Sequence, residues 1–260
     1  MRSGLIPCYV INLRRSTQRK EWMERQLGEQ GIKPIFIDAV DGDTLSDIEL
    51  TKHLNSQLLK EEWPTLTKRE AGCALSHIKA YTDIVRNGYS AAVILEDDVR
   101  LTEDFCELLN PLSDICVGSR LSSGRPEMMH LSGVRRGYRF TTRQFGTARL
   151  LVRPASTVWH ASGYAINLAG AESLATNLYP VWMVADNWYR FKEKGLIRLL
   201  ALSPPPVQRS VLHESSNIRP KNATHRIRPD KRRKNISERC RRIMYDLARP
   251  FVTRKLKKPM

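Results

Sequence analysis

Ala91-Ala92-Val93-Ile94-Leu95-Glu96-Asp97-Asp98 is the stretch of this 260-residue chain that decides the fold. Its first five residues are all apolar, without the alternation of a strand that has one face in water. Such a run is typical of a strand that is buried on both faces of a sheet. Three carboxylates follow it directly. The stretch therefore predicts a central strand that ends in an acidic segment.

A β-α-β pattern precedes this strand. Residues 9–11 and 35–37 are short β-branched and aromatic runs, and we expect each to form a strand. Ser16 is suited to N-cap a helix between them. That helix is expected to end near residues 28–30, with Gly31 at the C′ position. Two strands joined by a helix predict parallel pairing.

A longer amphipathic helix leads into the central strand. Thr67 and Glu70 have the spacing of a capping box, apolar residues follow at helical intervals, and Gly88 ends the pattern. The remaining elements expected are helices over 47–63, 104–112, 168–178 and 182–194, and strands over 128–131, 150–152, 162–166 and 197–202. The fold class predicted from this pattern is α/β, a sheet flanked by helices.

The charge of the chain is unevenly distributed. The formal net charge is +16, but residues 219–260 carry 16 basic and 3 acidic side chains, whereas residues 1–218 carry 27 basic and 24 acidic ones. This distribution excludes a uniformly basic ribosomal type of protein. It predicts a nearly neutral domain over 1–218 and a basic tail over 219–260.

Several classes of protein are not indicated by the sequence. No apolar run approaches the roughly 20 residues of a membrane span, and the first residues do not have the pattern of a signal peptide. The five cysteines are scattered and form no CxxC pair, so neither a zinc site nor a disulfide framework is indicated. We expect a cytoplasmic protein.

The acidic segment has two interpretations. Runs of charge are usually solvated loops or helix starts. However, ligands of open α/β sheets bind outside the carboxyl ends of the strands, and Glu96 and Asp98 would point to the same side of an extended segment. Two such carboxylates repel each other unless a cation lies between them. A hard divalent ion, Mn²⁺ or Mg²⁺, with open positions for phosphates is therefore expected here.

The ordered set of motifs resembles glycosyltransferase family 25, the lipopolysaccharide and collagen sugar transferases. The resemblance covers roughly residues 7–218. It rests on the segments Tyr9-Val10-Ile11-Asn12-Leu13 with Arg14, Ser16 and Arg19, Asp38-Ala39-Val40-Asp41-Gly42, Leu66-Thr67 to Glu70 with Gly72-Cys73, Leu75-Ser76-His77, Val93 to Val99, and Gly163-Tyr164 with Gly170-Ala171.

The resemblance implies a GT-A-type fold, which is a Rossmann-like mixed sheet flanked by helices. It also implies an inverting transfer, commonly of galactose from UDP-galactose. Glu96-Asp97-Asp98 then matches the acidic metal motif of the family, with Asp98 the stronger candidate ligand because Glu stands first. The residues expected at the donor are Asn12, Arg14, Arg19, Asp41, His77, Glu96 and Asp97. For Arg19 an exposed helical arginine is the alternative, and for His77 a buried, hydrogen-bonded histidine.

Inversion requires a base that takes the proton of the acceptor hydroxyl. Asp186 resembles the downstream aspartate of the family and is the candidate, with a helix N-cap as the alternative. Trp188 is expected to stack on an acceptor sugar, although it and Trp182 also suit a core. His160 is a candidate acceptor contact. His213 is a candidate third metal ligand, with a loop histidine as the alternative.

The basic tail has apolar residues at helical spacing over residues 237–258, interrupted by Pro250. A basic amphipathic helix favours an anionic membrane surface. Nucleic acid binding and docking of the apolar stripe onto the domain are the rival interpretations. The leading hypothesis is a transferase that acts on a lipopolysaccharide or lipo-oligosaccharide acceptor at the inner face of the cytoplasmic membrane. A non-catalytic nucleotide-binding or nucleic-acid-binding protein is the alternative.

Overall fold

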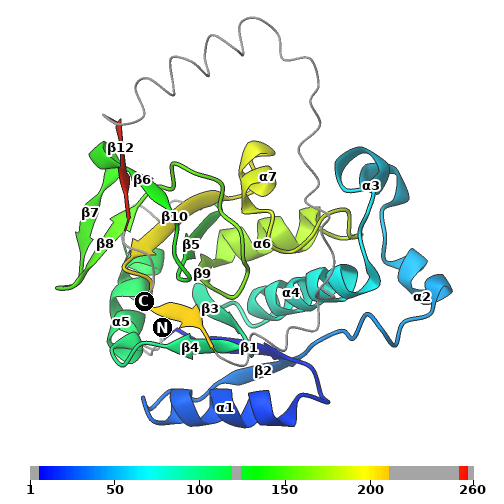
Figure 1. The fold of residues 1–260 in the computed structure, drawn as a ribbon, viewed down its shortest axis with the longest axis horizontal. Helices are drawn as coiled ribbons and strands as arrows, with labels where there is room; N and C mark the ends of the chain where they lie inside the picture. Colours follow the sequence, from blue (N-terminus) through cyan, green and yellow to red (C-terminus); the bar gives the residue numbers. More distant parts are fainter. Residues whose placement is uncertain (1–5, 119–123, 211–251, 257–260) are drawn as a thin grey trace, which may run out of the picture.

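An eight-stranded mixed sheet forms the centre of the computed structural model, which describes residues 6–118, 124–210 and 252–256 (Figure 1). The strand order is β2-β1-β3-β9-β5-β10-β8-β7. The strands are β1 (Cys8–Asn12), β2 (Ile35–Asp38), β3 (Ala91–Glu96), β5 (Glu127–His130), β7 (Arg143–Phe145), β8 (Arg149–Val152), β9 (Gly163–Asn167) and β10 (Arg198–Ser203). The α/β mixed sheet expected from the sequence is confirmed.

The central position of β3 is also confirmed, because its first five residues are buried. It pairs in parallel with β1, which pairs in parallel with β2, but it pairs antiparallel with β9. The reversed β9 lies between β3 and β5. As a result β1, β2, β3 and β5 end at one edge of the sheet and β9 begins there, so their adjoining loops meet at that edge.

Helices cover both faces of the sheet (Figure 1). The apolar side chains of α1 and α5 pack with one face of β1 and β3, and those of α4, α6 and α7 pack with the other face. The helices are α1 (Thr17–Gly28), α2 (Asp47–Lys52), α3 (Ser56–Glu62), α4 (Lys68–Arg86), α5 (Phe105–Gly118), α6 (Leu168–Asn177), α7 (Trp188–Glu193) and the short 3-10 turn η1 (Arg139–Thr141).

The helix ends agree with the sequence prediction at some positions and differ from it at others. The capping box of α4 is present, with Thr67 and Glu70 bonded to each other's backbone N–H groups. Ser16 occupies the N-cap position of α1 but makes no side-chain cap bond. The helix expected over 47–63 is two helices, because Asn55 starts α3 with its own cap. The helix expected within 182–194 is present as α7, which begins at Trp188.

Two small sheets complete the described structure. Strand β4 (Val99–Leu101) pairs with β11 (Val207–Arg209), and β6 (Arg136–Tyr138) pairs with β12 (Thr253–Lys255). The helix expected over 237–258 is therefore wrong for residues 253–255. These residues form a strand because β6 offers an edge with which their backbone pairs, and Thr253 is buried there. Residues 237–251 and 257–258 of that expected helix lie outside the described residues.

Within the described residues no helix is both long enough and apolar enough to cross a membrane.

Candidate active site

A pocket opens at the edge where β1, β2 and β3 end. Its empty volume, which includes space open to solvent, is about 680 Å³. It lies between the strand ends, the loop after β2 and one face of α4. The residues lining it are Ile11, Leu13, Arg15, Arg19, Ala39, Val40, Asp41, Gly42, Asp43, Arg69, Cys73, Ser76, His77, Glu96, Asp97 and Asp98.

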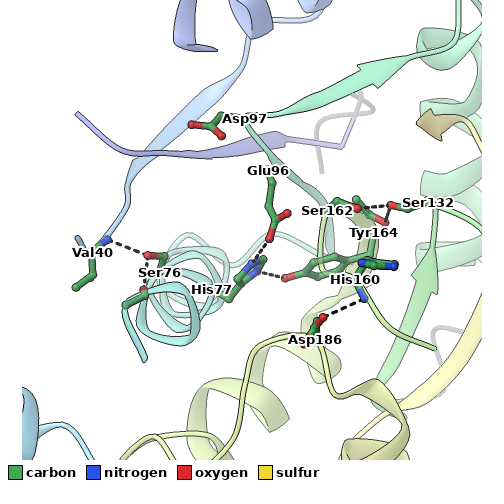
Figure 2. A network of polar contacts seen from close by, with 12 residues as sticks. Val40, Ser76, His77, Glu96, Asp97, Ser132, His160, Ser162, Tyr164 and Asp186 are labelled. Carbon is green, nitrogen blue, oxygen red and sulfur yellow. Dashed lines mark hydrogen bonds and ion pairs between the residues drawn. The ribbon is translucent and has the colours of Figure 1, made fainter. Parts of the chain in front are cut away.

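Two glycines let the loop after β2 contact α4 directly. A Cβ on Gly72 would lie 2.6 Å from the carbonyl oxygen of Val40, and one on Gly42 would lie 2.0 Å from that of Lys68. Ser76 ties the two together, because its hydroxyl accepts a hydrogen bond from the Val40 N–H at 2.8 Å (Figure 2). This wall of the pocket is therefore fixed by backbone contact.

The acidic segment is a turn, and the extended geometry expected for it is wrong. Strand β3 ends at Glu96, and Asp97 and Asp98 form the turn into β4. In Figure 2 the Glu96 side chain points toward α4 while Asp97 points to the other side of the strand. Glu96 is 24% exposed, and Asp98 is buried but lines the pocket. Glu96 and Asp98 thus share the pocket, as expected.

Asp97 is held by two of the residues expected at the donor. It accepts hydrogen bonds from Asn12 Nδ2 at 2.7 Å and from Arg19 Nη1 at 3.0 Å. The side chains of Arg19 and Asp97 are 14% and 10% exposed, so Arg19 is not the exposed helical arginine of the alternative interpretation. Burial raises the pKa of Asp97, and the Arg19 charge opposes that shift. The three residues first of all stabilise the turn.

Glu96 faces His77 across the pocket (Figure 2). The Oε1–Nε2 distance is 3.5 Å, and His77 Nδ1 lies 2.8 Å from the hydroxyl of Tyr164. The buried, hydrogen-bonded state of His77 is confirmed, and its ring also lines the pocket. Burial raises the pKa of Glu96, as do the negative charges of Asp98 and Asp186. His77 opposes this shift in the pKa of Glu96.

Of the two arginines expected at the donor, Arg19 lines the pocket and Arg14 does not. Arg14 is 83% exposed and forms an ion pair with Asp38, outside the lining of the pocket. Its neighbour Arg15 lines the pocket and pairs with Asp41. Arg69 of α4 also lines the pocket. The sequence analysis did not identify Arg15 or Arg69 as pocket residues. The turn after β1 decides which of Arg14 and Arg15 faces the pocket.

Asp186 lies near this pocket but not in its lining. Its Oδ2 accepts a hydrogen bond from the backbone N–H of His160 at 3.3 Å (Figure 2). The alternative role of Asp186 as a helix cap is wrong, because Asn187 caps α7 by accepting from the Arg190 N–H. His160 is exposed and has a φ of 74°, a left-handed conformation that is uncommon outside glycine and clusters at functional sites.

Trp188 is wrongly placed by the sequence analysis. It is fully buried, packs edge-on against Tyr164 with ring centroids 4.9 Å apart, and donates its indole N–H to the carbonyl of His160. Trp188 therefore supports the His160 loop from the protein interior, and its buried ring cannot stack on an acceptor sugar. Trp182 is buried as well, whereas Trp159, beside His160, is 39% exposed.

The donor set of the pocket suits a hard divalent ion. Glu96 and Asp98 provide carboxylate oxygens, the ligands that Mg²⁺ and Mn²⁺ prefer. The raised pKa of Glu96 shows that a positive charge here would be favourable. His213, the expected third ligand, lies outside the described residues.

Known proteins are similar to this chain in sequence. The profile of glycosyltransferase family 25, described as an LPS biosynthesis protein, matches residues 5–189. Procollagen galactosyltransferase 2 of Homo sapiens is 30% identical over 176 residues, which are 66% of this chain and 27% of that protein. The inactive glycosyltransferase 25 family member 3 of Mus musculus is 37% identical over 124 residues, 46% of this chain and 21% of that protein.

The chain thus spans between about a fifth and about a quarter of the length of these relatives. A solved structure, of a glycosyltransferase involved in the glycosylation of the major capsid of PBCV-1, covers 66% of this chain and 64% of its own with a TM-score of 0.31 and 11% identity. That likeness is too low to bear on function. The profile match takes in every residue that lines the pocket and also Asp186, and on this evidence the chain belongs to glycosyltransferase family 25.

Proposed function

We propose that the chain is an inverting, metal-dependent glycosyltransferase that transfers galactose from UDP-galactose to a lipopolysaccharide or lipo-oligosaccharide acceptor. The observation that carries the proposal is the convergence of Glu96, Asp98 and Asp186 at one edge of the sheet, where the pocket opens. The galactosyl donor is supported by the human relative, which is named a galactosyltransferase.

The residues divide the chemistry among them. Glu96 and Asp98 would hold the divalent ion, which supplies positive charge to the leaving diphosphate. Arg15 and Arg69 line the same pocket and add positive charge toward the phosphates. Asp186 acts as the base: its carboxylate accepts the proton of the acceptor hydroxyl as that oxygen attacks the anomeric carbon from the face opposite UDP.

The backbone of the His160 loop orients this base. The His160 N–H donates to one carboxylate oxygen of Asp186, and the buried Trp188 and His130 both contact the His160 carbonyl. The loop is thus held from two sides.

UDP release from UDP-galactose, measured with and without Mn²⁺ and with a lipo-oligosaccharide acceptor, tests the proposal. Asp98→Asn and Asp186→Asn are each expected to lower kcat by about 10²-fold or more, the range for loss of a positioned acid or base. Glu24→Gln on the outer face of α1 is the matched control. If no UDP-sugar is turned over and Asp98→Asn binds UDP as the wild type does, the transferase assignment is wrong.

A non-catalytic nucleotide-sugar-binding role is the second candidate, and the name of the inactive mouse relative favours it. It predicts saturable UDP-galactose binding without product. A collection of other UDP-sugars in the same assay separates a different donor from a lack of catalysis.

The acceptor side is proposed to face an anionic membrane, and the support is the charge of residues 219–260. Replacing Lys231, Arg232, Arg233 and Lys234 by Gln leaves β12 in place. This variant should co-sediment less with anionic vesicles, and equal binding would contradict the membrane proposal. Added RNA that competes for wild-type binding would favour the nucleic-acid interpretation instead.

A further inference from the structure

A second set of potential metal ligands lies in the pocket on the side of α4. Cys73 and His77 are one helical turn apart and face the end of β3. The thiol of Cys73, a ring nitrogen of His77 and a carboxylate oxygen of Glu96 all lie within 4.8 Å of one another. Sulfur, nitrogen and oxygen ligands together form a different donor set from the carboxylate pair Glu96 and Asp98.

The ring of His77 has one nitrogen without a hydrogen-bond partner in the described part of the chain. That atom is Nε2, and the side chain that carries it is only 2% exposed. Nδ1 lies 2.8 Å from the Tyr164 hydroxyl. With the Nδ1 proton donated to Tyr164, Nε2 carries a lone pair directed at Glu96. Metal-binding histidines usually have this arrangement, in which the second ring nitrogen donates to a fixed partner.

The distances suit a small tetrahedral ion. Zinc–nitrogen and zinc–oxygen bonds of about 2.1 Å at a tetrahedral angle place the two ligand atoms about 3.4 Å apart. His77 Nε2 and Glu96 Oε1 are 3.5 Å apart. Zinc–sulfur bonds of about 2.3 Å require the sulfur about 3.6 Å from the other two atoms. The Cys73 sulfur lies within 4.8 Å of the other two ligand atoms, so a small side-chain adjustment brings it to the distance that zinc requires.

We propose that Cys73, His77 and Glu96 form a binding site for a borderline-soft divalent cation, Zn²⁺, with its fourth position open to the pocket. Binding converts the Cys73 thiol to a zinc-bound thiolate and releases one proton to solvent. The carboxylates of Glu70, Asp98 and Asp186 lie near enough to act on the thiol, and they raise its pKa together with burial. The same negative charges attract a dication.

The site shares Glu96 with the proposed hard-ion site. Because Glu96 belongs to both sets of ligands, Zn²⁺ is expected to compete with Mn²⁺ for this carboxylate. An effect of Zn²⁺ on sugar transfer would rest on the proposed function, whereas the binding of Zn²⁺ would not. The test therefore measures binding by a signal that does not depend on turnover.

Co²⁺ serves as the spectroscopic probe for the site, because a cobalt–thiolate bond gives a near-ultraviolet charge-transfer band. The full chain is expected to bind Co²⁺ with this band and to lose the band when Zn²⁺ is added. Cys73→Ser should abolish the band and weaken Zn²⁺ affinity by about 100-fold or more, since loss of an outer-sphere partner alone costs 10- to 100-fold. His77→Ala and Glu96→Gln should weaken Zn²⁺ affinity as well.

Cys106→Ser is the matched control, because Cys106 is also a free, partly exposed cysteine but lies on α5, away from the pocket. It should keep the band and the affinity. Circular dichroism identifies any variant that has failed to fold, and Glu96→Gln then tests the same site without touching the helix. The absence of a band in the wild type, or a band that persists in Cys73→Ser, would overturn the proposal.

Discussion

Replacing Arg19 by Met should destabilise the protein in a way that depends on pH. Arg19 is the main positive charge acting on Asp97, and both side chains are nearly buried. Removing one partner of a buried pair leaves an uncompensated charge, which typically costs about 3–5 kcal/mol. Here Asp97 limits the cost, because its carboxylate can take up a proton instead of remaining charged.

That limit can be calculated. Protonating a carboxyl with the ordinary pKa of 3.8 at pH 7 costs about 4.4 kcal/mol, at about 1.36 kcal/mol per pH unit. Burial has already raised the pKa of Asp97, so the cost of protonation is smaller. We therefore expect a loss of about 2–4 kcal/mol at pH 7. Removing Arg19 raises that pKa further, and a raised folded-state pKa means that stability is regained as the pH falls.

Urea unfolding at pH 7 and at pH 5 measures both parts of the prediction. The Arg19→Met variant should be clearly less stable than the wild type at pH 7, and the difference should shrink at pH 5. Arg14→Met is the control, because Arg14 belongs to the same sequence motif but pairs with Asp38 in solvent, and no measurable loss is expected. A loss equal at both pH values, or no loss at pH 7, would refute the structural role of Arg19.

Three further predictions concern the frame of the site. Gly72→Ala should cost about 1–3 kcal/mol by overpacking, because its Cβ meets the Val40 carbonyl; an unchanged melting temperature would contradict this. Burial lowers the pKa of His130 to about 4. The free energy of unfolding should therefore fall by about 3 kcal/mol between pH 6.5 and pH 4. Urea unfolding of His130→Gln should show a smaller dependence on pH. The contact with Arg190 lowers the pKa of Glu62 to about 2. The free energy of unfolding should therefore fall below pH 4.5, by about 1–2 kcal/mol once the ion pair is discounted for screening by solvent. Glu62→Gln should remove this loss.

The frame of the site could be predicted because its signals are local. The apolar run of β3 and the capping box of α4 act through nearest neighbours in sequence, and both form as expected. Glu96 was expected at the carboxyl end of the central strand, and it lines the pocket at that edge. This inference needs only the periodicity of the chain and the rule that ligands of open α/β sheets bind at the carboxyl ends of the strands. His77 was expected there only from the resemblance to the family.

The errors concern contacts that depend on tertiary packing. A tryptophan after a loop can stack on a ligand or fill a core, and only the packing of Tyr164 against Trp188 decides between them. The inward turn of Arg15 in place of Arg14 depends on the loop after β1. Residues 253–255 have helical spacing but pair with β6, more than 100 residues away in sequence, so their strand state was not readable locally.

Similarity alone does not separate an active from an inactive member of this family, since the inactive mouse relative is more similar over its matched region than the human galactosyltransferase is. The physical state of the pocket is more informative. Glu96 is held where burial and two carboxylates disfavour its charge, and His77 keeps a buried nitrogen without a hydrogen bond in the described structure. Both features lower the stability of the folded chain. The proposed cation would offset both costs, so the two features support the proposal that the pocket binds one.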